Sequence, residues 1–189
     1  MTLFGQAWQA TSGPFGGHIT VVSSKNSDLY AGTLAGGLFK STDNGSTWGY
    51  ISSLPCSQVI FLASNDSYIY ASKSPNGGGV YRSSDNGASW SEINTGINGL
   101  GGAMSIATNK DTVLVGCYQS GVVISLNGGN SWTKPSGLIA STIVSALAIY
   151  GAYYFAGTSD GSGGVFRSAD KGTNWTQVNS GLTNKRIQT

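Results

Sequence analysis

Short apolar segments alternate along the chain with turns that are rich in Gly, Asn, Asp and Ser. The segments are about five to seven residues long and are dominated by β-branched and aromatic side chains. Segments of this kind, bounded by turn residues, are typical of β-strands. Apolar positions do not recur at helical spacing over a useful length of the sequence. The pattern therefore predicts an all-β protein.

The same order of four predicted strands occurs four times. In each unit a polar or small turn joins the first two strands, and a Gly-rich connection leads to the third. Four short strands in about 42 residues is the period of a β-propeller blade. We therefore predict a β-propeller with about four blades, at 15–55, 56–97, 98–138 and 139–182. The predicted strands are 18–24, 29–33, 37–41 and 48–52; 58–64, 68–73, 79–83 and 90–94; 103–109, 113–118, 121–125 and 132–136; and 143–149, 153–158, 164–168 and 175–179.

The composition of the strands predicts their order within a blade. The first strand of each unit is the most apolar, which suits an innermost strand packed between neighbouring blades. Pro135 lies in the fourth predicted strand of the third unit. Proline is tolerated on an edge strand and not inside a sheet. The fourth strand is therefore predicted to be the outer edge.

The turn before each fourth strand carries one motif, Ser-x-Asp-x-Gly-x-x-Trp or a close variant. Its closing tryptophans are 42, 42 and 43 residues apart. A catalytic site rarely occurs four times at even spacing, whereas a structural joint is needed in every repeat. The motif is therefore interpreted as scaffold. The copies are KSTDNGSTW (40–48), RSSDNGASW (82–90), ISLNGGNSW (124–132) and RSADKGTNW (167–175).

These motifs resemble the Asp-box, or BNR repeat, of sialidases, xyloglucan-degrading enzymes, sortilin-type receptors and photosystem II assembly factors. The resemblance covers roughly residues 15–182 and implies a hairpin between the third and fourth strands, remote from the active-site face. It implies that the acidic residues accept backbone N–H bonds of their own turn, that the glycines are left-handed and that the tryptophans cover the hairpin. Asn127 would keep the acceptor geometry without the charge and give a somewhat weaker turn. The implied structural residues are Ser41, Asp43, Gly45, Trp48, Ser83, Asp85, Gly87, Trp90, Ser125, Asn127, Gly129, Trp132, Ser168, Asp170, Gly172 and Trp175.

The composition narrows the classes of partner. The 189 residues carry a net charge of +2 and are only 10% charged, which gives no reason to expect a nucleic-acid partner. No apolar run approaches the ~18 residues of a membrane helix, so we expect no membrane insertion. The N-terminus lacks a signal-peptide pattern, although a signal could have been removed. We expect an extracellular or cell-surface location.

The sequence predicts no metal site and no cofactor. Each Asp motif offers one carboxylate and no nearby Glu, which is too few oxygen ligands for a calcium loop. His18 is the single histidine. Cys56 and Cys117 do not form a CxxC motif, and they are either two separate thiols or a disulfide.

The carboxylate inventory argues against an enzyme. Hydrolysis of a glycosidic bond usually takes two carboxyl groups. Of the eight here, three lie in the motifs, three lie in or beside turns after first strands, and Glu92 lies on an outer strand. Only Asp160 remains, in a connection on the face where such propellers bind ligands. Arg82 and Arg167 occupy one repeat position rather than a convergent anion clamp, so the sialidase pattern is absent.

The connections between second and third strands hold the candidate ligand-binding residues. Tyr118 and Gln119 lie in one connection, Asn76 in another and Asp160 in a third. They are either chance loop chemistry or a face that contacts a sugar or a peptide. Two functions stay open. One is a non-catalytic scaffold or binding module for a glycan or protein ligand, or for self-assembly. The other is a fragment of an Asp-box glycoside hydrolase or assembly factor whose active residues lie outside this chain.

The ends of the sequence hold parts of further blades. Residues 7–13 match the register of a fourth strand, and residues 185–189 begin a new first strand. These half-blade remnants lack second and third strands, so they do not add up to a shared closing blade. We therefore expect a piece of a longer propeller or a chain that self-associates, and not a closed four-bladed monomer.

Overall fold

A computed structural model describes residues 12–15, 17–73, 79–97, 102–118, 120–135, 143–161 and 163–188. These ranges contain fifteen β-strands and no helix, which confirms the predicted all-β class. A membrane-spanning helix is accordingly not found in the described ranges.

The strands form four antiparallel sheets in chain order. The first two sheets contain β1 (Ile19–Lys25), β2 (Asp28–Thr33), β3 (Leu38–Ser41) and β4 (Gly49–Ile51), then β5 (Val59–Ser64), β6 (Ile69–Lys73), β7 (Val80–Ser83) and β8 (Ser91–Glu92). The other two contain β9 (Ala103–Asn109), β10 (Thr112–Cys117) and β11 (Gly121–Ser125), then β12 (Val144–Tyr150), β13 (Tyr153–Thr158), β14 (Val165–Ser168) and β15 (Thr176–Gln177).

The third sheet has three strands, so the prediction of a fourth strand at 132–136 is wrong. A single bridge between Ile124 and Thr133 stands in its place. In two other sheets the residue at the position of Pro135 donates its N–H to the third strand, as Ile93 does to the Val80 carbonyl at 3.0 Å. Pro135 has no N–H, so the ladder stops after the bridge.

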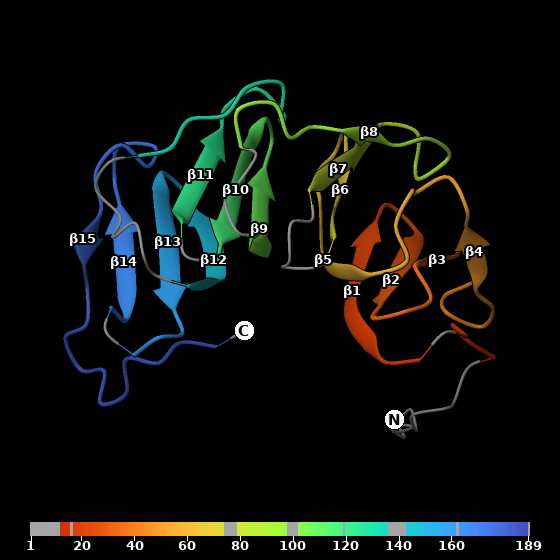
Figure 1. The fold of residues 1–189 in the computed structure, drawn as a ribbon, viewed down its shortest axis with the longest axis horizontal. Coiled ribbons are helices and arrows are strands. Elements are labelled where there is room, and N and C mark those ends of the chain that lie inside the picture. Colours follow the sequence, from red (N-terminus) through yellow and green to blue (C-terminus); the bar gives the residue numbers. More distant parts are fainter. Residues whose placement is uncertain are drawn as a thin grey trace, which may run out of the picture.

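The sheets are blades arranged around an axis. The first strands β1, β5, β9 and β12 lie on the inside of an arch, and β4, β8 and β15 lie on its outside (Figure 1). Successive first strands pack against one another, β1 on β5, β5 on β9 and β9 on β12. The fold is that of a β-propeller.

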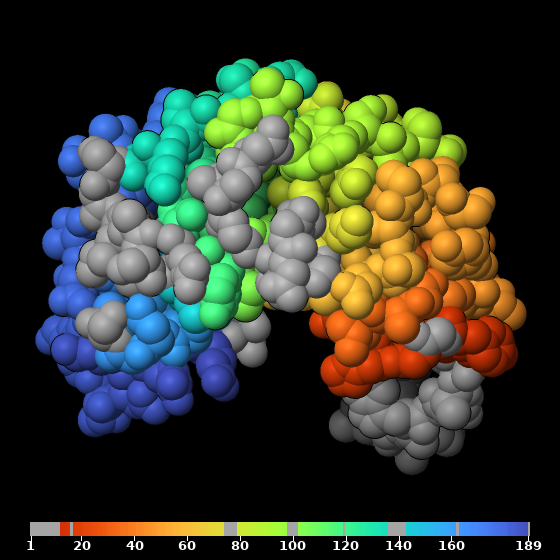
Figure 2. Space-filling model, viewed as in Figure 1, coloured from red at the N-terminus to blue at the C-terminus, as the bar shows by residue number. Residues whose placement is uncertain are grey.

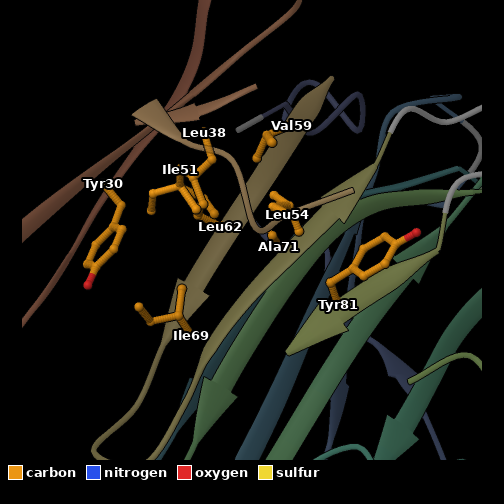
Figure 3. Close-up of a cluster of buried hydrophobic side chains, with 9 residues drawn as sticks. All are labelled: Tyr30, Leu38, Ile51, Leu54, Val59, Leu62, Ile69, Ala71 and Tyr81. Carbon is orange, nitrogen blue, oxygen red and sulfur yellow. The ribbon is translucent and has the colours of Figure 1, made fainter. Parts of the chain in front are cut away.

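Each pair of neighbouring blades shares one hydrophobic cluster. We call the side of a blade that faces the next blade its trailing face, and the other side its leading face. At the first joint Tyr30 and Leu38 of blade one, both fully buried, meet Ile69 and Tyr81 of blade two (Figure 3). Two further clusters join blades two and three and blades three and four. Burial between blades is the main source of apolar stabilisation.

The ring is open. None of the hydrophobic clusters of the described residues joins blade four to blade one. Figure 2 shows a gap between the blue fourth blade and the red first blade. The four blades that the structure describes therefore do not close into a ring.

The two terminal remnants are residues 7–13 and residues 185–189. Most of residues 7–13 lies outside the described residues. Residues 185–188 form no strand, contrary to the expectation of a new first strand. Ile187 nevertheless packs on blade four: its N–H donates to the Thr158 carbonyl at 2.8 Å, and its carbonyl accepts from Ser145 Oγ at 2.7 Å.

Candidate functional site

The strand order gives the molecule two ends. Because neighbouring strands are antiparallel, the β1–β2 turn and the Ser-x-Asp turn of a blade lie at one end. We call this the motif end. The connections between second and third strands lie at the other, the connection end. The Ser-x-Asp turns and the candidate ligand residues therefore lie on opposite ends of the molecule.

The first Ser-x-Asp turn is closed by its own side chains. Asp43 Oδ1 accepts from Ser41 Oγ at 2.7 Å and from the Thr47 N–H at 2.9 Å, and Asp43 Oδ2 accepts from Thr47 Oγ1 at 2.6 Å. Ser41 Oγ in turn accepts the Gly45 N–H at 2.9 Å. Gly45 has a φ of 85°, which glycine adopts at little cost. The Trp48 indole donates to the Gly45 carbonyl at 3.1 Å.

The other three turns repeat the bonds of the Ser and Asp positions with different side chains, whereas the bond from the indole to the motif glycine recurs only at Trp175. Asp85 Oδ2 accepts from Ser89 Oγ at 2.6 Å, and Asp170 Oδ2 accepts from Asn174 Nδ2 at 2.7 Å. In the third turn the hydrogen bond between these two side chains runs in the opposite direction: Asn127 Nδ2 donates to Ser131 Oγ at 2.8 Å. Asn127 Oδ1 still accepts the Ser131 N–H at 2.9 Å. A neutral amide thus makes the same turn.

These bonds shift the acid–base behaviour of the aspartates. Bonds from the Thr47 hydroxyl and N–H, with a smaller one from Ser41, lower the pKa of Asp43 to about 2. The equivalent bonds from Ser89 lower the pKa of Asp85 to about 2. The Asn174 N–H and side chain lower the pKa of Asp170. Carboxylates held in this way are poor proton donors at neutral pH.

The Ser-x-Asp turns of blades two and three also contact the preceding blade. Tyr30 of blade one donates its hydroxyl to the Asn86 carbonyl at 3.2 Å, and Ser53 donates to the Gly87 carbonyl at 2.7 Å. At the next joint Arg82 Nη1 donates to the Gly128 carbonyl at 2.6 Å. The same guanidinium lies over the Tyr68 ring at 4.6 Å.

The motif glycines fit against the preceding blade as well. A Cβ on Gly87 would lie 2.9 Å from Ile51 Cδ1. A Cβ on Gly172 would lie 1.9 Å from Ile124 Cδ1. No blade precedes Gly45 among the described residues, and within them its Cβ would meet Leu29 and Trp48 of its own blade, at 3.6 and 3.8 Å. These contacts between blades were not predicted from the sequence, although the recurrence of Tyr30 and Tyr70 at one repeat position was a signal.

Other carboxylates also have local partners. Asp28 Oδ2 lies 2.7 Å from Lys40 Nζ. Glu92, exposed on β8, accepts from Asn94 Nδ2. Within the described ranges, no three His, Cys, Asp or Glu side chains gather as a metal site would require. Cys56 and Cys117 are free thiols, and burial raises the pKa of Cys117 to about 12.

The connection end carries two of the four candidate ligand residues. Tyr118, 39% exposed, follows β10, and Asp160, also exposed, follows β13. β10 packs against β12 of the next blade, so the two connections belong to neighbouring blades. Leu34 in the first connection is 44% exposed. Asn76 and Gln119 lie outside the described residues.

Comparison with known proteins identifies the fold. No family model and no curated protein matches the chain. Among solved structures, an ancestral GH74 enzyme matches with a TM-score of 0.72 and 21% identity over 92% of this chain and 25% of its own. The GH74 xyloglucanase from Xanthomonas campestris matches with a TM-score of 0.73 and 16% identity over 94% of this chain and 32% of its own.

A second kind of neighbour is YCF48. The protein from Cyanidioschyzon merolae matches with a TM-score of 0.70 and 16% identity, over 91% of this chain and 59% of its own. A structure of YCF48 bound to a D1 peptide matches with a TM-score of 0.66, at 18% identity, over 91% of this chain and 56% of its own. At these identities the likeness concerns the fold. The chain spans about a quarter to a third of the GH74 enzymes.

Proposed function

We propose that this chain is a non-catalytic Asp-box propeller segment that binds a glycan or a peptide at its connection end. The observation that carries the proposal is the use of its carboxylates. Asp43, Asp85 and Asp170 are held ionised inside their own turns, and Asp28 and Glu92 have local partners. A glycosidase needs a paired acid and base or nucleophile instead.

The connection end is the favoured binding surface because it carries Tyr118 and Asp160, which lie outside the repeat pattern. Tyr118 and Asp160 differ from the residues at the same positions of other blades. An exposed tyrosine offers a ring face and a hydroxyl, which suit both sugars and peptides. The named neighbours, a xyloglucanase and YCF48 bound to a peptide, make these two ligand classes the first to test.

The test is binding of the purified chain to a glycan array and a peptide array. Tyr118→Ala and Asp160→Asn are expected to weaken binding of any ligand found. Asp85→Asn, at the motif end, is the matched control and should bind as the parent does. Loss of binding in Asp85→Asn at unchanged thermal stability would contradict the proposal.

A second candidate is a fragment of an Asp-box glycoside hydrolase or assembly factor. The match to a small share of the GH74 chains favours it. Incubation with xyloglucan and with sialosides tests it. We expect no hydrolysis by this chain, and turnover that disappears in Asp160→Asn would favour the enzyme.

A further inference from the structure

We propose that the trailing face of blade four binds the leading face of blade one in a second copy of this chain. The contacts would repeat those of the three joints inside the molecule. The partner is thus a second Ser-x-Asp blade array, added head to tail. This proposal is independent of the ligand at the connection end.

The trailing face of blade four is the one that lacks a neighbour. Phe155, Val165 and Val178 are half-buried, and Leu182 is 40% exposed. The residues at the same repeat positions of the internal joints are 0–9% exposed: Tyr30, Tyr70 and Leu114; Leu38, Val80 and Val122; Ile51 and Ile93; and Ile97. Leu54, one residue earlier in its unit than Ile97, is 2% exposed.

The leading face of blade one shows the complementary deficit. Val22 on β1 is 61% exposed, whereas Leu62, at its position in blade two, is 8% exposed and lies in the first joint. Leu29 is half-buried, whereas its counterparts Ile69 and Val113 are fully buried. Apolar side chains are therefore uncovered on both end faces.

Blade four also carries an arginine at the position from which Arg82 makes a polar contact across an internal joint. Arg167 lies over the Tyr153 ring at 5.2 Å, just as Arg82 lies over Tyr68. Arg82 bonds the turn of the next blade through the Gly128 carbonyl at 2.6 Å and Asn130 Oδ1 at 3.0 Å. Arg167 is exposed and makes no such bond to a described residue.

The first turn of a second copy supplies the missing acceptors. By repeat position, Gly128 and Asn130 correspond to Asn44 and Ser46, whose main-chain and side-chain oxygens would face Arg167. No described blade precedes Gly45 in that turn, and Val178 stands where Ile51 contacts Gly87. Ser12 Oγ donates to the Ser46 carbonyl at 2.9 Å, so docking also displaces Ser12 from this turn. Once Ser12 is displaced, the first turn offers the trailing face of blade four the same kinds of contact as the internal joints.

Ile187 occupies the inner edge of the trailing face of blade four, at the place that the next inner strand takes in an internal joint. A Cβ on Gly32 of blade one would meet Val59, and a Cβ on Gly116 would meet Val144, each the first residue of the next inner strand. A Cβ on Gly157 of blade four would meet Ile187 in the same way. In a second copy the corresponding residue is Ile19, so docking displaces Ile187 from this position.

Sedimentation velocity on the full chain over a wide range of concentrations tests the proposal. We expect reversible association of the parent. Arg167→Glu/Leu182→Asp damages the trailing face, and Val22→Asp damages the leading face. Each should raise the concentration at half-association roughly tenfold or more. Tyr150→Ser changes a tyrosine that is 76% exposed at the end of β12, and it should associate as the parent does.

Mixing the two face variants separates head-to-tail docking from unspecific association. Each variant keeps one intact face, so an equimolar mixture should form a one-to-one complex that grows no further. A chain ending at Thr183 should associate more strongly than the full chain, because Ile187 no longer competes with Ile19. Circular dichroism verifies that each variant is folded, and Leu182→Asp alone replaces the double variant if that variant unfolds. A parent that is monomeric throughout, a mixture that fails to associate, or weaker association of the shortened chain would overturn the proposal.

Discussion

Asp43 and Asp85 keep their charge well below the pH at which an exposed carboxylate takes up a proton. The hydroxyl and N–H of a residue four positions later in the turn bond the ionised form, which sets the pKa of each at about 2. In the unfolded chain these groups titrate near pH ~3.9. Their stabilising effect is therefore complete above the unfolded pKa and is lost as the pH falls toward 2.

The first prediction follows from this difference. The melting temperature should be nearly constant from neutral pH to about pH 5 and should fall between about pH 4 and pH 2. Replacing Asp43, Asp85 and Asp170 together by Asn should remove most of that fall, because Asn127 already makes the turn without a charge. Circular dichroism melts across this pH range measure it. An undiminished fall in the triple variant would disprove the role of these carboxylates.

The second prediction compares two glycines of the motif. Gly45→Ala and Gly172→Ala both force alanine to a positive φ, which costs roughly 1–2 kcal/mol. Gly172→Ala also drives a Cβ against Ile124 of the preceding blade, which adds about 1–3 kcal/mol. Urea unfolding should therefore show a larger loss for Gly172→Ala. Equal losses of unfolding free energy would mean that the fourth Ser-x-Asp turn does not pack against the preceding blade.

At the scale of the strand, the inner edge of a joint is set by a close approach of two backbones. A Cβ on Gly116 of β10 would lie 2.6 Å from the Val144 carbonyl oxygen of the next blade. Main-chain atoms cannot turn aside as a side chain can. A Cβ on Gly116 would also lie 2.8 Å from Val144 Cγ1, so the joint needs glycine where the next strand begins with valine. Blade two has Ser72 at this position, and the strand that follows begins with the smaller Ala103.

Gly116→Ala and Gly157→Ala form a matched pair for the third prediction. Gly116→Ala should lower the free energy of unfolding by roughly 1–3 kcal/mol, because it separates blades three and four. Gly157→Ala should cost less, because its Cβ would meet the side chain of Ile187 in the terminal segment. Guanidinium unfolding of both variants measures the difference. A larger loss for Gly157→Ala would contradict this account.

The sequence predicted strands well and joints poorly, for a physical reason. β9, β11 and β13 have the expected bounds, because alternating apolar residues and turn residues are local signals. The hydrogen bonds within the Ser-x-Asp turns are equally local. The bond from Tyr30 to Asn86 spans 56 residues and depends on the rotation between blades, which no local pattern encodes. The missing strand at 132–136 could have been inferred, since Pro135 removes the N–H that its position needs.

At the scale of the whole molecule, the blades differ in how many neighbours they have. Among the described residues, the hydrophobic clusters cover both faces of blades two and three but one face each of blades one and four. Stability in such an array is approximately a sum over units and their joints. The end blades should therefore open at lower free energy than the middle ones.

Hydrogen exchange measures this fourth prediction. Amides of β6 and β10 should exchange more slowly than amides of β2 and β13, at a concentration where the chain is monomeric. Two slowly exchanging middle blades between two rapidly exchanging end blades are the expected result. Uniform exchange across all four blades would show instead that the array opens as one unit.

The repeated joint also determines which changes of chain length this protein tolerates. Removal of residues 59–102 would join Gln58 to Ala103 and bring the trailing face of blade one against the leading face of blade three. The two faces have the same repeat positions as the faces of the existing joints, so the shorter array keeps the alignment between neighbouring blades. Removal of half as many residues would leave strands without partners. Gene duplication or loss in steps of one blade is thus the path along which chains of this kind can lengthen or shorten and still fold.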